Sequence, residues 1–134
     1  MGTVVVGFVP KPEGEAALDR AIEEAKLRGA RVVVVNSHRG GGDLDQESSS
    51  RADQDMEAVK AKLDAAGVDH ELRKLVRGFE PAEDLIGIAD DADAELIVIG
   101  LRRRSPVGKL ILGSNAQRIL LDAKCPVLAV KADA

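Results

Sequence analysis

The sequence predicts an α/β fold in which a five-stranded, parallel, doubly wound sheet of order 3-2-1-4-5 carries helices on both faces. Short runs rich in Val, Ile and Leu alternate along the chain with longer segments whose apolar residues recur at helical spacing. Strict alternation of strand and helix is typical of a parallel sheet with right-handed crossovers. The strand runs are apolar at consecutive positions, as expected where helices cover both faces. With 134 residues and 45% hydrophobic content, the chain suits a single domain over residues 1–134.

The first two strands are predicted at residues 3–9 (TVVVGFV) and 31–37 (RVVVVNS), which are β-branched and apolar. The segment between them has an apolar face at helical spacing, and Gly29 is predicted to end that helix. The face consists of Leu18, Ala21, Ile22 and Ala25.

The middle of the chain is more polar. Residues 38–50 contain three consecutive glycines and three consecutive serines without apolar periodicity, which predicts a mobile loop. A second helix follows and ends at Gly67, with an apolar face formed by Ala52, Met56, Val59, Leu63 and Ala66. Residues 68–76 (VDHELRKLV) alternate imperfectly between polar and apolar, as an exposed edge strand would.

A third helix is predicted to open with Pro81 at or near its first position. Its buried face is expected to comprise Leu85, Ile86 and Ala89. Residues 96–99, closed by Gly100, form the apolar run of a fourth strand buried on both faces.

The last helix is predicted to begin at Gly113 and Ser114. Ser114 would cap its first turn, and Gln117 would close a capping box. Its apolar face comprises Ala116, Ile119, Leu120 and Ala123. Pro126 then leads into a final strand from Val127 to Val130.

The loop between the fourth strand and the last helix is basic. It holds Arg102, Arg103, Arg104 and Lys109, and no Asp or Glu occurs from Leu96 to Leu121 in a chain of net charge −4. A glycine before a helix lets backbone N–H groups approach a ligand, and the helix N-terminus favours an anion. The N–H groups of Ser114 and Asn115 are therefore predicted to bind phosphate or another anion. The alternative interpretation is a solvated basic turn.

Topology selects the same loop. In the order 3-2-1-4-5, ligands bind beyond the carboxyl ends of strands 1 and 4, where the winding direction reverses. Those ends fall at residues 8–12 and 100–113, so the basic loop lies at the predicted switch point.

Composition argues against several other classes of partner. Aromatic content of 1% and a pI near 5.2 disfavour nucleic-acid binding. No apolar run is long enough for a membrane span and no signal-peptide pattern follows Met1, so a cytoplasmic protein is expected. The single cysteine, Cys125, excludes an internal disulfide and is interpreted as a small buried residue. No metal site is predicted, because His38 and His70 stand apart and the run from Asp90 to Asp93 suits a solvated turn.

Enzyme motifs are also missing, and the protein is predicted not to be an enzyme. The stretch from Val107 to Leu110 (VGKL) lacks the first glycine and the Ser or Thr of a Walker A loop. A phosphoacceptor receiver domain needs acidic residues after strand 1 and strand 3, and this sequence has none at those places. A flavodoxin needs a Ser/Thr/Gly-rich loop after strand 1, which is also missing. No combination of nucleophile, base and orienting group is evident.

The loop and the helix after it resemble the universal stress protein family, and the resemblance covers essentially the whole chain. Nucleotide-binding members carry a glycine after strand 4, two residues, a second glycine, nine residues, and then Gly-Ser or Gly-Thr. Here Gly100 and Gly113-Ser114 hold those places, while Arg103 replaces the second glycine. Val9 stands where the family has an Asp that contacts the nucleoside.

The resemblance implies a regulatory, stress-related protein that binds ATP, a related adenine nucleotide or another phosphate-bearing ligand. The residues expected at the site are Ser37, Gly100, Arg102, Arg103, Lys109, Gly113, Ser114 and Asn115. Ser37 falls near the family position that lines the base pocket. Arg103 either donates to the phosphate or fills the space of the nucleotide.

The alternative function is an interaction module of the stress response that binds no nucleotide. A homodimer is expected in either case, because the run from Val127 to Val130 is uncharged and lies at a sheet edge. In the family this strand commonly pairs across a two-fold axis.

Overall fold

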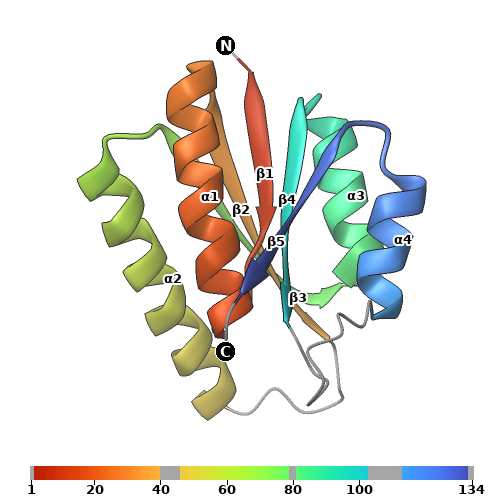
Figure 1. Cartoon of the computed structure of the whole chain (residues 1–134). Coiled ribbons are helices and arrows are strands. Elements are labelled where there is room, and N and C mark those ends of the chain that lie inside the picture. The colour runs from red at the N-terminus through yellow and green to blue at the C-terminus, as the bar shows by residue number, and fades with distance from the viewer. Residues whose placement is uncertain (1, 40–45, 79–80, 103–112, 133–134) are drawn as a thin grey trace.

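The computed structural model describes residues 2–39, 46–78, 81–102 and 113–132, with backbone only at 37–39, 46–53, 74–78, 81 and 102. Nine elements follow one another in strict alternation (Figure 1). They are β1 (Thr3–Gly7), α1 (Pro12–Arg28), β2 (Arg31–Arg39), α2 (Gln46–Ala66), β3 (His70–Gly78), α3 (Pro81–Asp91), β4 (Leu96–Arg102), α4 (Ser114–Asp122) and β5 (Val127–Ala132).

The strands form one parallel sheet of order β3-β2-β1-β4-β5, which confirms the predicted topology. β1 is central: Val4 pairs with Val32 of β2 on one side and with Leu96 of β4 on the other. The chain therefore winds first toward β3 and then toward β5, and the direction reverses between β1 and β4.

Two apolar cores lie on the two faces of the sheet, because successive side chains of a strand point to opposite faces. Val4 and Val6 pack with α1 and α2, whereas Val5 packs with α3 and α4. Figure 1 shows the same division of the helices. All four predicted positions of the first helix, Leu18, Ala21, Ile22 and Ala25, are buried.

Two helix ends are as predicted. Gly29 and Gly67 both adopt the left-handed conformation, with φ of 63° and 71°, which glycine enters without the steric cost of a Cβ. In α2, Met56, Val59 and Leu63 form the buried face.

The predicted loop over residues 38–50 is wrong at both of its ends. β2 continues to Arg39, and α2 already begins at Gln46; residues 40–45 lie outside the described part of the chain. Apolar periodicity reports only a helix face that is buried, so a polar first turn gives no such signal. Strand ends also shift: β1 stops at Gly7, and β4 runs through Gly100 to Arg102.

The predicted cap at Ser114 is wrong by one residue. Gly113 is the N-cap, with extended backbone, and its carbonyl accepts a hydrogen bond of 3.0 Å from the N–H of Gln117. Ser114 is then the first helical residue, so its side chain is not in the capping position.

The buried face of α3 also differs from the prediction in one position. Ile88 is buried together with Leu85 and Ala89, whereas Ile86 is only partly buried. Positions i, i+3 and i+4 of a helix share a face, and Ile86 lies beside that face.

Candidate ligand pocket at the switch point

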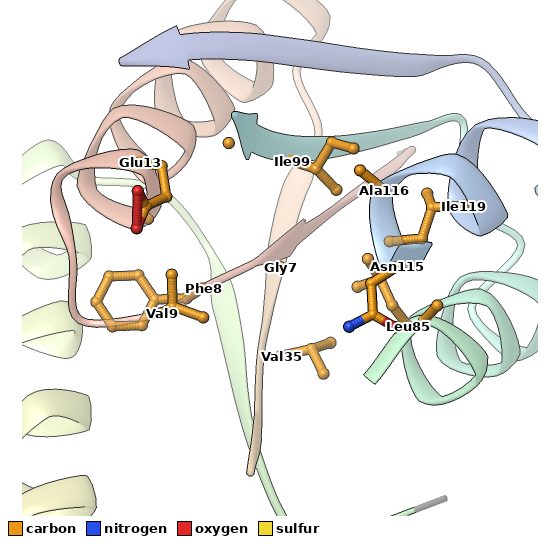
Figure 2. Close-up of a pocket in the computed structure, with 13 residues that line it drawn as sticks. Gly7, Phe8, Val9, Glu13, Val35, Leu85, Ile99, Asn115, Ala116 and Ile119 are labelled. Carbon is orange, nitrogen blue, oxygen red and sulfur yellow. The ribbon is translucent and has the colours of Figure 1, made fainter. Parts of the chain in front are cut away.

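A pocket of about 190 Å³ lies between the carboxyl ends of β1 and β4 and the start of α4. β1 and the turn after it contribute Gly7, Phe8 and Val9, α1 contributes Glu13 and Gly14, and β2 contributes Val35. The remaining lining residues are Ala82, Leu85, Ile99, Gly100, Asn115, Ala116 and Ile119. Figure 2 shows Glu13, Phe8 and Val9 on one side and Asn115, Ala116 and Ile119 on the other.

Two glycines let backbone segments approach each other closely at this edge of the sheet. A Cβ built on Gly100 would lie 1.9 Å from the carbonyl oxygen of Glu13, and one on Gly14 would lie 1.7 Å from that of Val9. No side chain fits at either position. The glycines therefore allow the start of α1 to pack directly on β4 and bring Glu13 to the pocket.

The walls of the pocket are mainly apolar. Val35, Leu85, Ile99 and Ile119 each expose less than a tenth of their surface. Such a lining with few polar groups is typical of a site for a small organic ligand.

The start of α4 supplies the polar side of the pocket through Asn115. The N–H groups of Ser114, Asn115 and Ala116 have no carbonyl acceptor within the helix, because they belong to its first turn. No acidic residue occupies that turn, whereas the first turns of α1 and α3 each hold two. The helix N-terminus at the pocket therefore favours an anion and carries no neutralising carboxylate of its own.

Glu13 is the second polar group of the lining. Its Oε2 atom is buried and has no hydrogen-bond partner among the described residues. A buried polar atom without a partner costs free energy, so a hydrogen bond donated to this carboxylate would be favourable.

The structure places the predicted site residues unevenly. Gly100 and Asn115 line the pocket. Gly113 and Ser114 are exposed at the start of α4 directly before Asn115. The backbones of Ser37 and Arg102 lie near the carboxyl end of β2 and at the end of β4. Arg103 and Lys109 lie outside the described residues.

Several residues of the pocket wall were missed by sequence reasoning, among them Glu13, Val35, Leu85 and Ile119. Val35 precedes the predicted Ser37 by two residues on the same strand. The apolar character of Val35, Leu85 and Ile119 indicated only that these residues belong to the hydrophobic core. Glu13 resembled an ordinary acidic residue of a first helical turn, which the helix dipole favours.

Elsewhere, among the residues that the structure describes, no group of three or more His, Cys, Asp or Glu side chains could hold a metal ion. The Nδ1 atom of His70 lies 2.9 Å from the carbonyl oxygen of Val68, which accepts a hydrogen bond when Nδ1 carries the proton. Cys125 is partly buried, and this burial raises the pKa of its thiol. Within the described helices, none has the length and apolarity needed to cross a bilayer.

The chain is an α/β protein with a mainly apolar pocket at its topological switch point. The model of the universal stress protein family matches residues 1–131. A universal stress protein from Mycolicibacterium smegmatis is 44% identical over 128 residues, which is 96% of each chain. The chain belongs to the universal stress protein family.

Solved structures agree with this assignment. A universal stress protein from Archaeoglobus fulgidus superposes with a TM-score of 0.85 at 41% identity, covering 98% of this chain and 99% of that one. A universal stress protein from the same organism in complex with dAMP superposes with a TM-score of 0.79 at 35% identity, covering 98% of both chains.

Proposed function

We propose that this protein is a regulatory protein that binds an adenine nucleotide at the switch-point pocket. The observation that carries the proposal is the pairing of an apolar cavity with an unneutralised helix N-terminus at its edge. The complex of a relative with dAMP supports the choice of an adenine nucleotide.

The two parts of the pocket suit the two parts of such a ligand. The phosphate would bind the N–H groups of Ser114 and Asn115, with the basic residues Arg102, Arg103 and Lys109 adding positive charge. The base would lie against the apolar wall of Val35, Leu85 and Ile99. Ser37 remains the proposed polar residue at the base end.

Binding, rather than catalysis, is the proposed activity. Membership of the family supports a stress-related regulatory role, and the cytoplasm is the proposed location. Among the described residues that line the pocket, two have polar side chains, Glu13 and Asn115, and none is Ser, Cys or His. No metal is part of the proposal, and one domain would carry the function.

The direct test is to denature the purified protein and identify any released nucleotide by mass spectrometry. Calorimetric titration of ligand-free protein with ADP and pyrophosphate then measures the affinity. We expect saturable binding of both, weakened by salt because the phosphate interaction is electrostatic. No released nucleotide and no heat with either ligand would refute the proposal.

The second candidate function is a dimeric interaction module, and the edge strand β5 favours it. β5 pairs with β4, and no other described strand lies beside it. Its residues from Val127 to Val130 are only partly buried, and Leu121 of α4 is 82% exposed. An apolar edge of this kind is usually covered in solution.

We propose a homodimer through this edge for either function. Light scattering at micromolar concentration should give twice the mass of the chain. Leu128→Lys should shift the mass to that of a monomer, because a charge would be buried in the interface. Lys131→Ala is the control, since this residue of the same strand is exposed. A monomeric wild type, unchanged by Leu128→Lys, would exclude the interface.

A further inference from the structure

The feature that the proposed function leaves unexplained is the carboxylate of Glu13. Its Oε2 is buried in the pocket wall without a described hydrogen-bond partner. The helix dipole accounts for an acidic residue in the first turn of α1, but Glu15 in the same turn is exposed and pairs with Lys62 at 3.3 Å. The dipole therefore does not account for a buried carboxylate oxygen on a residue that lines an apolar pocket.

The position of Glu13 is set by backbone packing. Its carbonyl oxygen lies against Gly100 of β4, where a Cβ would come within 1.9 Å. The backbone of Glu13 thus belongs to a close contact between α1 and β4. Figure 2 shows its carboxylate beside Phe8 and Val9, on the side of the pocket away from α4.

The charges at the two ends of the pocket are opposite. The α4 end favours an anion, whereas the Glu13 end would repel one. A phosphate-bearing ligand must therefore direct its phosphate toward α4 and present a hydrogen-bond donor to Glu13. A hydroxyl group suits this place better than an ammonium group. A hydroxyl has one hydrogen to donate, whereas an ammonium has three, and the lining offers few acceptors for three.

We propose that Glu13 is a specificity-determining residue that accepts hydrogen bonds from the sugar hydroxyls of the bound nucleotide. The inference rests on the proposed function, because it assumes that a nucleotide occupies this pocket. It assigns to α1 a contact that the sequence resemblance places at position 9, where this chain has Val9. The ligand class is thereby narrowed to nucleotides that retain at least one sugar hydroxyl.

The experiment compares AMP, 2′,3′-dideoxy-AMP and pyrophosphate by calorimetric titration, with EDTA present so that no divalent cation bridges the carboxylate and the phosphate. Wild type should bind AMP about 10- to 100-fold more tightly than the dideoxy compound, as for one hydrogen bond to a charged group. Glu13→Ala should lower this preference to below about threefold. Glu13→Gln, which keeps the shape and one acceptor oxygen, should retain part of it.

Glu15→Ala is the matched control, because it removes the same charge from the same helical turn outside the pocket. It should keep the full preference for AMP. Pyrophosphate should bind Glu13→Ala and Glu15→Ala equally well. Equal binding also shows that both variants are folded, and that any gain in affinity from the lost negative charge is the same in both.

The other outcomes distinguish a wrong role for Glu13 from a wrong proposed function. If wild type binds AMP and pyrophosphate but shows no preference over the dideoxy compound, the role of Glu13 is wrong and the proposed function stands. The same holds if Glu13→Ala keeps the full preference. If neither AMP nor pyrophosphate binds wild type, the proposed function fails, and the role of Glu13 fails with it.

Discussion

Gly100 of β4 and Glu13 of α1 are in backbone contact so close that a Cβ on Gly100 would lie 1.9 Å from the carbonyl oxygen of Glu13. This contact joins the two sides of the topological switch point, because α1 follows β1 and Gly100 lies on the neighbouring strand β4. The sequence motif marks Gly100 as a ligand residue. The structure shows that it is also a packing residue, which holds the first turn of α1 against the sheet.

Gly100→Ala should therefore destabilise the protein by about 1–3 kcal/mol, because the added methyl group has to displace backbone rather than a flexible side chain. Urea unfolding monitored by circular dichroism measures the loss. Gly87→Ala is the control: Gly87 lies within α3, and apart from its chain neighbours and the nearby backbone of that helix, no described atom lies within 4 Å of its Cβ position. That variant should gain about 0.5–1 kcal/mol. Equal stabilities for the two variants would contradict the packing role.

Lys62 of α2 links the two helices on one face of the sheet. Its Nζ lies 2.5 Å from Asp19 and 3.3 Å from Glu15, both on α1. The hydrogen bond to Asp19 is the main cause that raises the pKa of Lys62. Because the side chains are 40% exposed or more, Lys62→Met should cost less than about 1 kcal/mol at pH 7.

The pH dependence of this contribution has a definite sign. A lysine pKa raised on folding gives stability that is complete below the unfolded pKa, near 10.4, and is lost as the pH rises through the folded pKa. The difference between wild type and Lys62→Met should thus shrink above about pH 10.4. Lys60→Met is the control, because Lys60 pairs with Asp64 on its own helix. A difference that grows with pH would contradict the assignment.

Cys125 should react slowly with alkylating reagents. Burial raises the pKa of its thiol, and Asp90 adds a smaller effect in the same direction, so less of the reactive thiolate is present at neutral pH. The rate of iodoacetamide labelling at pH 8 should be lower than that of free cysteine, and Asp90→Asn should raise it slightly. A rate above that of free cysteine would indicate an activated thiol.

Arg103 should strengthen phosphate binding if it acts as a donor. Arg103→Ala would then weaken pyrophosphate binding by about 1.5–3 kcal/mol, as for one lost hydrogen bond between charged groups. Added salt should weaken wild-type binding more than binding by the variant. Calorimetry with ATP and pyrophosphate measures both effects. If Arg103→Gly instead strengthens ATP binding, Arg103 fills the nucleotide space.

Much of the fold could be predicted because it depends on signals that the sequence carries locally. Consecutive apolar residues in β1 and β4, helical spacing in α1, and the left-handed glycines Gly29 and Gly67 each report burial or backbone conformation directly. The polar start of α2 could not be predicted in this way, because a helical turn without a buried face has no apolar period.

The pocket was predictable in its location but not in its composition. The switch point follows from strand order, and the strand ends that it names include Phe8, Val9 and Gly100, which line the pocket. Glu13 could not be recognised as a lining residue, since its position depends on the close contact of α1 with Gly100, which no residue pattern within α1 indicates. Side chains such as Leu85 and Ile119 serve both the core and the pocket wall, so their apolar character does not separate the two roles.

The central claim is that a phosphate-bearing nucleotide binds at the switch-point pocket, and amide chemical shifts measured by NMR during titration with AMP test it most directly. We expect saturable shifts at Gly7, Phe8, Gly100, Ser114 and Asn115, with unchanged shifts around Lys124 and Cys125 at the opposite end of α4. Saturable shifts confined to Lys124, Cys125 and their neighbours, or no shifts at any concentration, would contradict the claim.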